Sequence, residues 1–256
     1  MELKLKGKRA LITGASKGIG RACAEMLAAE GCSLLLCARD KQTLESTAAG
    51  LRTRHGAEVR WRAADLAQRG EAEGLASWAG EIDILVNNAG AIPGGDLQKV
   101  DEHSWRRAWD LKLFGYINLT REVYARMKEK HQGVIINIIG GAGEKMDANY
   151  IAGSSANAGL MAFTRALGGA SHADGIRVLG VNPGLVATDR MVTLLKQRAE
   201  AKFGDASRYQ ELYAGLPFGR PAAPEEIAAA VAFLASERSA YTTGCIVTID
   251  GGKSAS

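Results

Sequence analysis

The sequence is poor in the residues that mark a disulfide-stabilised, metal-binding or membrane-embedded protein. It holds only four cysteines and four histidines in 256 residues, and neither type shows the close spacing of a metal site. No apolar run approaches the ~20 residues of a membrane span. The charged segment 1–9 lacks the apolar stretch of a secretory signal. These absences predict a cytoplasmic protein with free, buried thiols, no bound metal and no membrane partner.

Charge of one sign is also scarce. The formal net charge is +4, and the 32 lysines and arginines are spread along the chain. No basic run interleaves with aromatic residues, which make up only 6% of the chain. A nucleic-acid surface normally combines both features. The sequence therefore predicts no nucleic-acid partner.

Short apolar runs alternate with longer helical patterns along the whole chain. Continuous apolar strands are typical of a parallel sheet covered by helices on both faces. No linker or shift in composition divides the chain, so residues 1–256 are expected to form one α/β domain. The predicted strands are Arg9–Thr13, Ser33–Cys37, Glu58–Arg62, Ile84–Asn87, Val134–Ile139, Arg177–Asn182 and Cys245–Ile249. The predicted helical segments are Gly18–Glu30, Asp40–Arg54, Trp105–Lys130, Leu160–His172 and Glu225–Ala235.

Residues 189–217 interrupt this alternation. The stretch is polar and helix-prone, and long insertions in compact folds are usually functional. We expect a flap that covers the active site, with a plain surface insertion as the alternative. Its apolar side chains suggest a moderately apolar pocket: Met191, Leu194, Leu195, Phe203, Tyr209, Leu212 and Tyr213.

A glycine-rich turn joins the first predicted strand to the first helix. Glycines permit a tight turn and let backbone N–H groups approach an anion at a helix N-terminus. The turn therefore predicts a site for the pyrophosphate of a dinucleotide. The residues assigned to it are Gly14, Ser16, Lys17, Gly18, Ile19 and Gly20.

Five separated motifs, starting with Thr13–Gly20 (TGxxxGxG), give the chain a resemblance to the short-chain dehydrogenase/reductase family. The other four are Asp65-Leu66, Asn87-Asn88-Ala89-Gly90, Asn182-Pro183-Gly184 with Val186 and Thr188, and the run from Gly219 to Gly252. The resemblance implies a Rossmann fold with a seven-stranded, doubly wound parallel sheet, and a homotetramer or homodimer. It also implies cofactor contacts from Asp65, Leu66, Asn88, Ala89, Gly90, Pro183, Gly184, Val186 and Thr188.

The residues after the second predicted strand favour NADP(H) over NAD(H). An NAD site usually places an acidic side chain there to bind the ribose 2′-hydroxyl. Here the position is Ala38, and Arg39 follows it. A guanidinium can pair with a 2′-phosphate, and Lys17 adds a second cation. The alternative is that Arg39 stacks on adenine or faces solvent.

The family's catalytic residues are replaced in this chain. The resemblance implies a Ser, a Tyr, a Lys and an Asn. Anchoring the comparison on Ala158-Gly159-Leu160 puts Gly140, Gly153, Asn157 and Lys112, respectively, at those four positions.

Tyr150 lies seven residues before Asn157, a spacing similar to that of the enoyl reductases in the same superfamily. Tyr150 is therefore the predicted proton donor, and the competing interpretation is a packing residue. Asn157 is predicted to bind the ribose hydroxyls, and Lys112 to supply the positive charge that lowers the pKa of the phenol. Ser154 and Ser155 are candidates for substrate contact, or alternatively an N-cap.

The leading hypothesis is an NADP(H)-dependent oxidoreductase of a small molecule. It would transfer hydride to or from a small apolar carbonyl compound or alcohol, or an activated C=C bond. One alternative is a non-catalytic NADP(H)-binding sensor or partner subunit, because the nucleotide motifs are intact while the catalytic residues are replaced. Another is non-redox lyase or isomerase chemistry in the same pocket.

Overall fold

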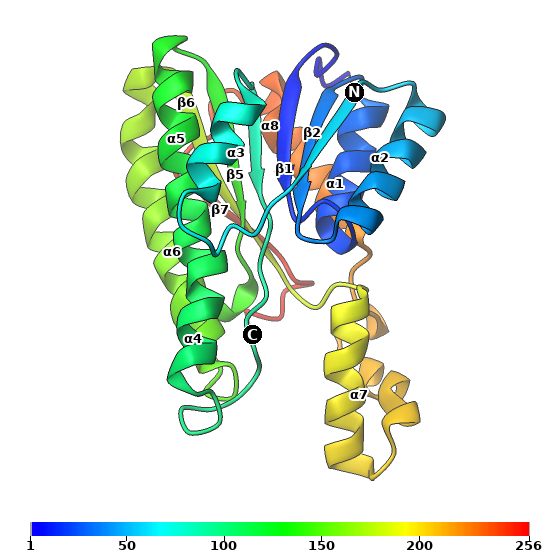
Figure 1. Cartoon of the computed structure of the whole chain (residues 1–256). Coiled ribbons are helices and arrows are strands. Elements are labelled where there is room, and N and C mark those ends of the chain that lie inside the picture. Colours follow the sequence, from blue (N-terminus) through cyan, green and yellow to red (C-terminus); the bar gives the residue numbers. More distant parts are fainter. Residues whose placement is uncertain (1, 256) are drawn as a thin grey trace.

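A single parallel sheet forms the centre of the molecule. The computed structural model describes residues 2–255, and the seven strands lie in the order β3-β2-β1-β4-β5-β6-β7 (Figure 1). The direction of winding reverses between β1 and β4, where ligands bind in such sheets. The predicted fold class is confirmed. The strands are β1 Arg9–Thr13, β2 Ser33–Ala38, β3 Val59–Ala63, β4 Ile84–Asn87, β5 Gly133–Ile138, β6 Ile176–Pro183 and β7 Ile246–Ile249.

Helices cover both faces of the sheet (Figure 1). One face is covered by α1 Gly18–Ala29, α2 Lys41–His55 and α8 Pro224–Ala235, which share one apolar core with the strands. The other face is covered by α3 Glu71–Ala79, α5 Gly115–Glu129 and α6 Ile151–Ala170. The core strands are buried on both sides, which explains their continuous apolar sequences.

The hydrogen-bonding pattern changes in the middle of the predicted helix Trp105–Lys130. The structure has α4 (Glu102–Trp109), a π-helical turn η1 (Asp110–Phe114) and then α5. Such turns are often found at functional sites.

Helix α6 begins nine residues before the predicted segment Leu160–His172. The N-cap interpretation of the serine pair is wrong, because Tyr150 occupies the cap position and Ser154 and Ser155 lie inside the helix. Residues 151–159 are mostly small, so they carry no apolar periodicity that would reveal a helix.

The segment predicted as a flap folds into α7 (Asp189–Phe203) and a 3₁₀ segment, η4 (Ala206–Gly215). These two pack on each other below the carboxyl edge of the sheet in Figure 1. Met191 and Leu195 are buried, and the Tyr209 and Tyr213 rings meet edge to face. The apolar side chains therefore stabilise the segment itself. Its function as a flap stays a prediction.

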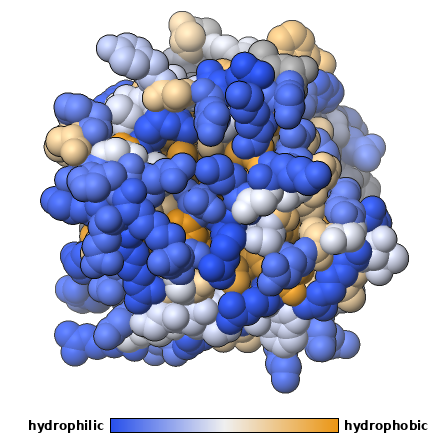
Figure 2. All heavy atoms as spheres, turned by 90° about the horizontal axis from the view of Figure 1, so that it is seen from above, coloured by the Kyte–Doolittle hydropathy of each residue, from blue (hydrophilic) through white to orange (hydrophobic). Residues whose placement is uncertain are grey.

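The opposite edge, at the amino ends of the strands, is mainly hydrophilic. Figure 2 shows this face from above, with polar side chains over most of it and the most apolar ones in the hollows between them. Within residues 2–255 no helix combines the length and apolar character needed to cross a membrane.

A chain of buried amides and hydroxyls links the central strands to the helices. The Asn87 amide on β4 donates to Thr120 on α5 (3.0 Å) and to Asn137 Oδ1 on β5 (2.9 Å). The Asn137 amide in turn donates to Thr164 on α6 (2.9 Å). All four side chains are almost fully buried. Because buried polar groups are costly when unpaired, this chain fixes the register of the two helices on the sheet.

Asn137→Ala should therefore lower the free energy of unfolding by roughly 2–4 kcal/mol, since it leaves Thr164 and Asn87 with lost partners. Urea unfolding followed by circular dichroism measures the change. Asn118→Ala is the matched control, because Asn118 bonds only to Arg121 one turn away at the surface. Equal stability of the two variants would contradict this account.

Candidate active site

The glycine-rich turn is held against the end of β4 by close packing. Thr13 Oγ1 accepts hydrogen bonds from the backbone amides of Asn88 (2.9 Å) and Ala89 (3.0 Å). The Asn88 side-chain amide donates back to the Thr13 carbonyl at 3.0 Å. A Cβ on Gly20 would overlap both the Gly14 carbonyl oxygen and the Asn88 amide. Gly20 therefore sets the approach of α1 to the sheet and does not itself line the pocket.

The N-terminus of α1 is open to a ligand. Its N-cap residue, Lys17, is extended and makes no side-chain capping bond. Gly14 and Gly18 have φ values of 65° and 57°, a left-handed backbone that glycine adopts without strain. An uncapped N-terminus with a glycine approach fits a pyrophosphate.

Arg39 lies at the other end of this nucleotide site. Arg39, directly after β2, is exposed, lines the pocket and forms no ion pair with any residue between 2 and 255. Asp40 is engaged as the N-cap of α2, accepting from the Thr43 amide at 2.9 Å. Asp65 accepts from the Ala67 amide at 3.2 Å. Arg39 is thus free to pair with a phosphate.

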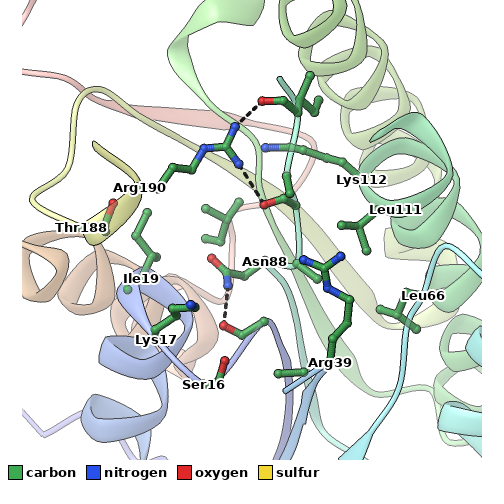
Figure 3. A pocket seen from close by; sticks show the side chains of 18 of the residues that line it. Ser16, Lys17, Ile19, Arg39, Leu66, Asn88, Leu111, Lys112, Thr188 and Arg190 are labelled. Carbon is green, nitrogen blue, oxygen red and sulfur yellow. Dashed lines mark hydrogen bonds between the residues drawn. The ribbon is translucent and has the colours of Figure 1, made fainter. Parts of the chain in front are cut away.

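One cavity of about 890 Å³ joins these elements at the carboxyl edge of the sheet (Figure 3). It is lined by nearly all the predicted cofactor residues, together with Lys112 and Tyr150. The predicted residues on its wall are Gly14, Ser16, Lys17, Gly18, Ile19, Arg39, Asp65, Leu66, Asn88, Ala89, Gly90, Lys112, Tyr150, Pro183, Gly184 and Thr188. On the flap side the wall is formed by Thr188, Asp189 and Arg190 rather than by apolar flap residues.

Five predicted residues lie outside this wall: Gly20, Val186, Asn157, Ser154 and Ser155. Val186 is buried and pairs with Ala222 in an isolated bridge, so it positions Thr188 without facing the cavity. Thr188 caps α7 by accepting from the Met191 amide at 3.3 Å.

Asn157 is buried behind the end of β5. A Cβ on Gly140 would lie 3.0 Å from the Asn157 amide nitrogen, and Asn157 Oδ1 has no hydrogen-bond partner. Gly140 also has a φ of 136°, which a serine rarely adopts. The structure thus places Asn157 beneath Gly140 and does not bring it to the cofactor pocket.

Tyr150 reaches the pocket across Gly153. A Cβ on Gly153 would overlap the Tyr150 ring at Cε1, so only glycine leaves room for this ring. The ring packs beside Ile92 and Ala152, and the side chain lines the cavity. Burial raises the pKa of Tyr150, and the nearby Arg190 cation lowers it in part. The phenol is therefore protonated at neutral pH and able to donate.

Ser154 stabilises the loop that carries Tyr150. Its hydroxyl accepts from the Asp147 amide at 3.0 Å and donates to the Asp147 carbonyl at 3.3 Å. Ser155 Oγ donates to the Ile151 carbonyl within the helix. Neither serine lines the cavity, so the structure gives them positions next to the site rather than in it.

Lys112 enters the pocket from the π turn η1. Its ammonium donates to the Ile139 carbonyl at 2.5 Å, and its stem lies against Gly90, where a Cβ would be only 2.8 Å from Lys112 Cδ. Burial and the neighbouring Arg190 cation lower the pKa of Lys112 to about 7. A lysine that is neutral above pH 7 carries no charge at the pH where a phenol ionises. The cation that acts on Tyr150 is therefore Arg190, not Lys112 as the sequence suggested.

Arg190 and Arg107 are functional candidates that the sequence prediction missed. Arg190, in the first turn of α7, extends across the pocket and donates to the carbonyls of Gly90 (3.3 Å) and Ile92. Figure 3 shows its guanidinium facing the Lys112 ammonium from the opposite side. Arg107 on α4 lines the same cavity. The only sequence signal for Arg190 is its place two residues after Thr188.

Comparisons with known proteins agree with this geometry. A family model described as short chain dehydrogenase matches residues 8–199. The chain is 35% identical over 257 residues to the 3-oxoacyl-[acyl-carrier-protein] reductase FabG of Vibrio cholerae, covering 98% of both chains. The solved L-sorbose reductase of Gluconobacter frateurii, complexed with NADPH and L-sorbose, matches with a TM-score of 0.91 and 32% identity over 98% of both chains. An actinorhodin polyketide ketoreductase with NADPH matches with a TM-score of 0.91 and 30% identity, covering 96% of this chain and 97% of that one.

The chain therefore belongs to the short-chain dehydrogenase family. It is an oxidoreductase enzyme that uses a nucleotide cofactor.

Lys112→Met should stabilise the protein most at low pH. Below pH 7 the wild-type chain carries a buried charge in the folded state, whereas the unfolded lysine has its ordinary pKa of 10.5. The free energy of unfolding of the wild type therefore increases by about 1.4 kcal/mol per pH unit as the pH rises from 7 toward 10.5. The stability gap between the variant and the wild type should shrink over that range in urea unfolding. A gap that is independent of pH would refute the lowered pKa.

Proposed function

We propose that this enzyme is an NADP(H)-dependent reductase of small carbonyl compounds, with Tyr150 as the proton donor. The observation that carries the proposal is the fit of the Tyr150 ring over Gly153. The family's tyrosine would stand at position 153, and the ring of Tyr150 covers that position from the preceding loop. The hydroxyl-bearing side chain thus lines the same cavity as the nucleotide motifs.

The cofactor assignment rests on the charges around its two ends. Lys17 and the α1 N-terminus fit the pyrophosphate. Arg39 fits a 2′-phosphate, because position 38 at the end of β2 is an alanine and not an acidic residue that would repel the phosphate. Two similar solved structures are described with NADPH. When bound, the reduced nicotinamide supplies the hydride.

The residues of this chain then orient the carbonyl and protonate it. Tyr150 donates a proton to the carbonyl oxygen, which becomes the alcohol. Arg190 stabilises negative charge on the phenol oxygen after the transfer, since it already lowers the pKa of Tyr150. Lys112 exchanges a proton near pH 7 and faces the same cavity. The names of the relatives, which are ketoreductases and a sugar reductase, favour C=O over C=C reduction.

We also propose that the chain forms a homotetramer or homodimer. Strand β7 has a neighbour on one side only and is half-buried, and Phe233 on α8 is exposed. An open edge strand beside exposed aromatic surface supports self-association. The expected cytoplasmic location stays a prediction.

Arg39→Gln should weaken NADPH binding at least about tenfold, because a charge-assisted hydrogen bond to the 2′-phosphate is lost. NADH binding should change little, since NADH has no phosphate there. Titration of cofactor fluorescence with both dinucleotides measures the ratio. An unchanged NADPH affinity would exclude Arg39 as the 2′-phosphate ligand.

Tyr150→Phe should lower kcat for carbonyl reduction by about 10²–10⁴-fold through loss of the proton donor. The dissociation constant of NADPH should stay the same, because the ring remains in place. Stopped-flow absorbance and equilibrium binding give the two quantities. Gly153→Ala provides a second variant, since the added Cβ displaces the Tyr150 ring while all catalytic groups remain. Full activity in both variants would rule out Tyr150.

A further inference from the structure

We propose that the substrate end of the pocket is an anion site formed by Lys112 and Arg190, and that the substrate is an oxo acid whose carboxylate binds there. This inference extends the proposed carbonyl reduction. Only the statement that the bound anion is a substrate depends on that proposed function. The anion site itself rests only on the arrangement of these two cations and their surroundings.

Lys112 has unused hydrogen-bonding capacity. An ammonium has three donors, and the Ile139 carbonyl takes one of them. No carboxylate between residues 2 and 255 pairs with it, although its side chain is half-buried. A cation that is removed from water without a counter-ion is costly unless a ligand supplies the missing charge.

Arg190 faces Lys112 across the cavity and also lacks a carboxylate partner among the described residues. Its two hydrogen bonds go to the neutral carbonyls of Gly90 and Ile92, which leaves other guanidinium N–H groups for a ligand. Two like charges aimed at one space repel each other, and an anion between them removes that repulsion. The lowered pKa of Lys112 is the expected sign of this unpaired arrangement.

The surroundings add positive potential. Arg107 lines the pocket and makes no ion pair with any residue of the described chain, whereas Arg106, its neighbour on α4, is paired with Glu102 outside the pocket. Two acidic residues lie on this part of the wall: Asp65, which accepts from the Ala67 amide, and Asp189 in the first turn of α7, where the helix dipole stabilises its charge. The three cations Lys112, Arg107 and Arg190 outnumber them. The substrate end therefore has a net positive charge.

The anion is assigned to the substrate rather than to the cofactor. The phosphate ligands described above, Lys17 and Arg39, come from the turns after β1 and β2. Lys112 lies against Gly90 and Ile139, at the ends of β4 and β5, in the cavity that Tyr150 also lines. A carboxylate bound there lies close to the carbonyl that Tyr150 protonates.

The test is equilibrium binding of 3-oxo acids of four to eight carbons, beginning with acetoacetate, compared with their neutral methyl esters. Isothermal titration calorimetry on the protein saturated with NADP⁺ measures both without turnover. The acids should bind at least about tenfold more tightly than the esters. Binding at pH 8 should also take up a proton, because an anion beside Lys112 raises the pKa of Lys112. The other ionisable groups that face Lys112 are Arg190 and Tyr150. Titration in two buffers of different ionisation enthalpy gives the proton number.

Arg190→Gln and Lys112→Met should each reduce the preference for the acid about tenfold or more, and Lys112→Met should abolish the proton uptake. Arg190→Lys should keep part of the preference, because the charge remains. Arg106→Gln is the matched control and should behave as the wild type. If Arg190→Gln and Arg190→Lys weakened the binding of acids and esters equally, Arg190 would serve only to attach α7 to the Gly90 and Ile92 carbonyls. That result would overturn the proposed anion site.

The remaining outcomes separate this inference from the proposed function. Acids that bind as expected but are not reduced with NADPH leave the anion site standing and contradict the reductase proposal. Esters that are reduced while acids show no preference support the reductase and overturn the anion site. Acids that bind the free protein but are displaced by NADP⁺ assign the two cations to the cofactor's phosphates, which also overturns it.

Discussion

The close approach of the glycine-rich turn to the end of β4 is the constraint on which the site depends. Gly20 has no Cβ, so α1 can lie against the Gly14 carbonyl and the Asn88 amide, and Thr13 can hold the first residues after β4. This contact fixes the α1 N-terminus and the Asn88–Gly90 turn relative to each other. One belongs to the nucleotide end of the pocket and the other supports Lys112 and Arg190. This one packing contact therefore fixes how far the α1 N-terminus lies from Lys112 and Arg190.

Cations without an acidic partner among the described residues line both ends of the pocket. At the nucleotide end the acidic groups Asp40 and Asp65 accept bonds from their own loops, which leaves the cations available. At the substrate end the buried Lys112 faces Arg190, and neither has an acidic partner within the described chain. Lys112 comes from the π turn η1, which joins α4 directly to α5.

The fold and the nucleotide site could be predicted from the sequence because their signals are local. Strands such as Ile84–Asn87 are continuous apolar runs, and the TGxxxGxG turn needs only its own backbone. The start of α6 could not be predicted, since small residues carry no periodicity. Arg190 was missed because its long side chain acts about a hundred residues away along the chain, at Gly90 and Ile92. Spacing between residues does not encode such contacts.

The ring of Tyr150 over Gly153 also has an evolutionary consequence. A tyrosine introduced at position 153 would meet the existing ring, and a serine at position 140 would meet Asn157 and an unfavourable φ. Each return to the family's usual residue is obstructed while its partner stays in place. Each of these single substitutions therefore needs a second change, at Tyr150 or at Asn157, before the new side chain fits. Sterics alone thus couple position 153 to position 150 and position 140 to position 157.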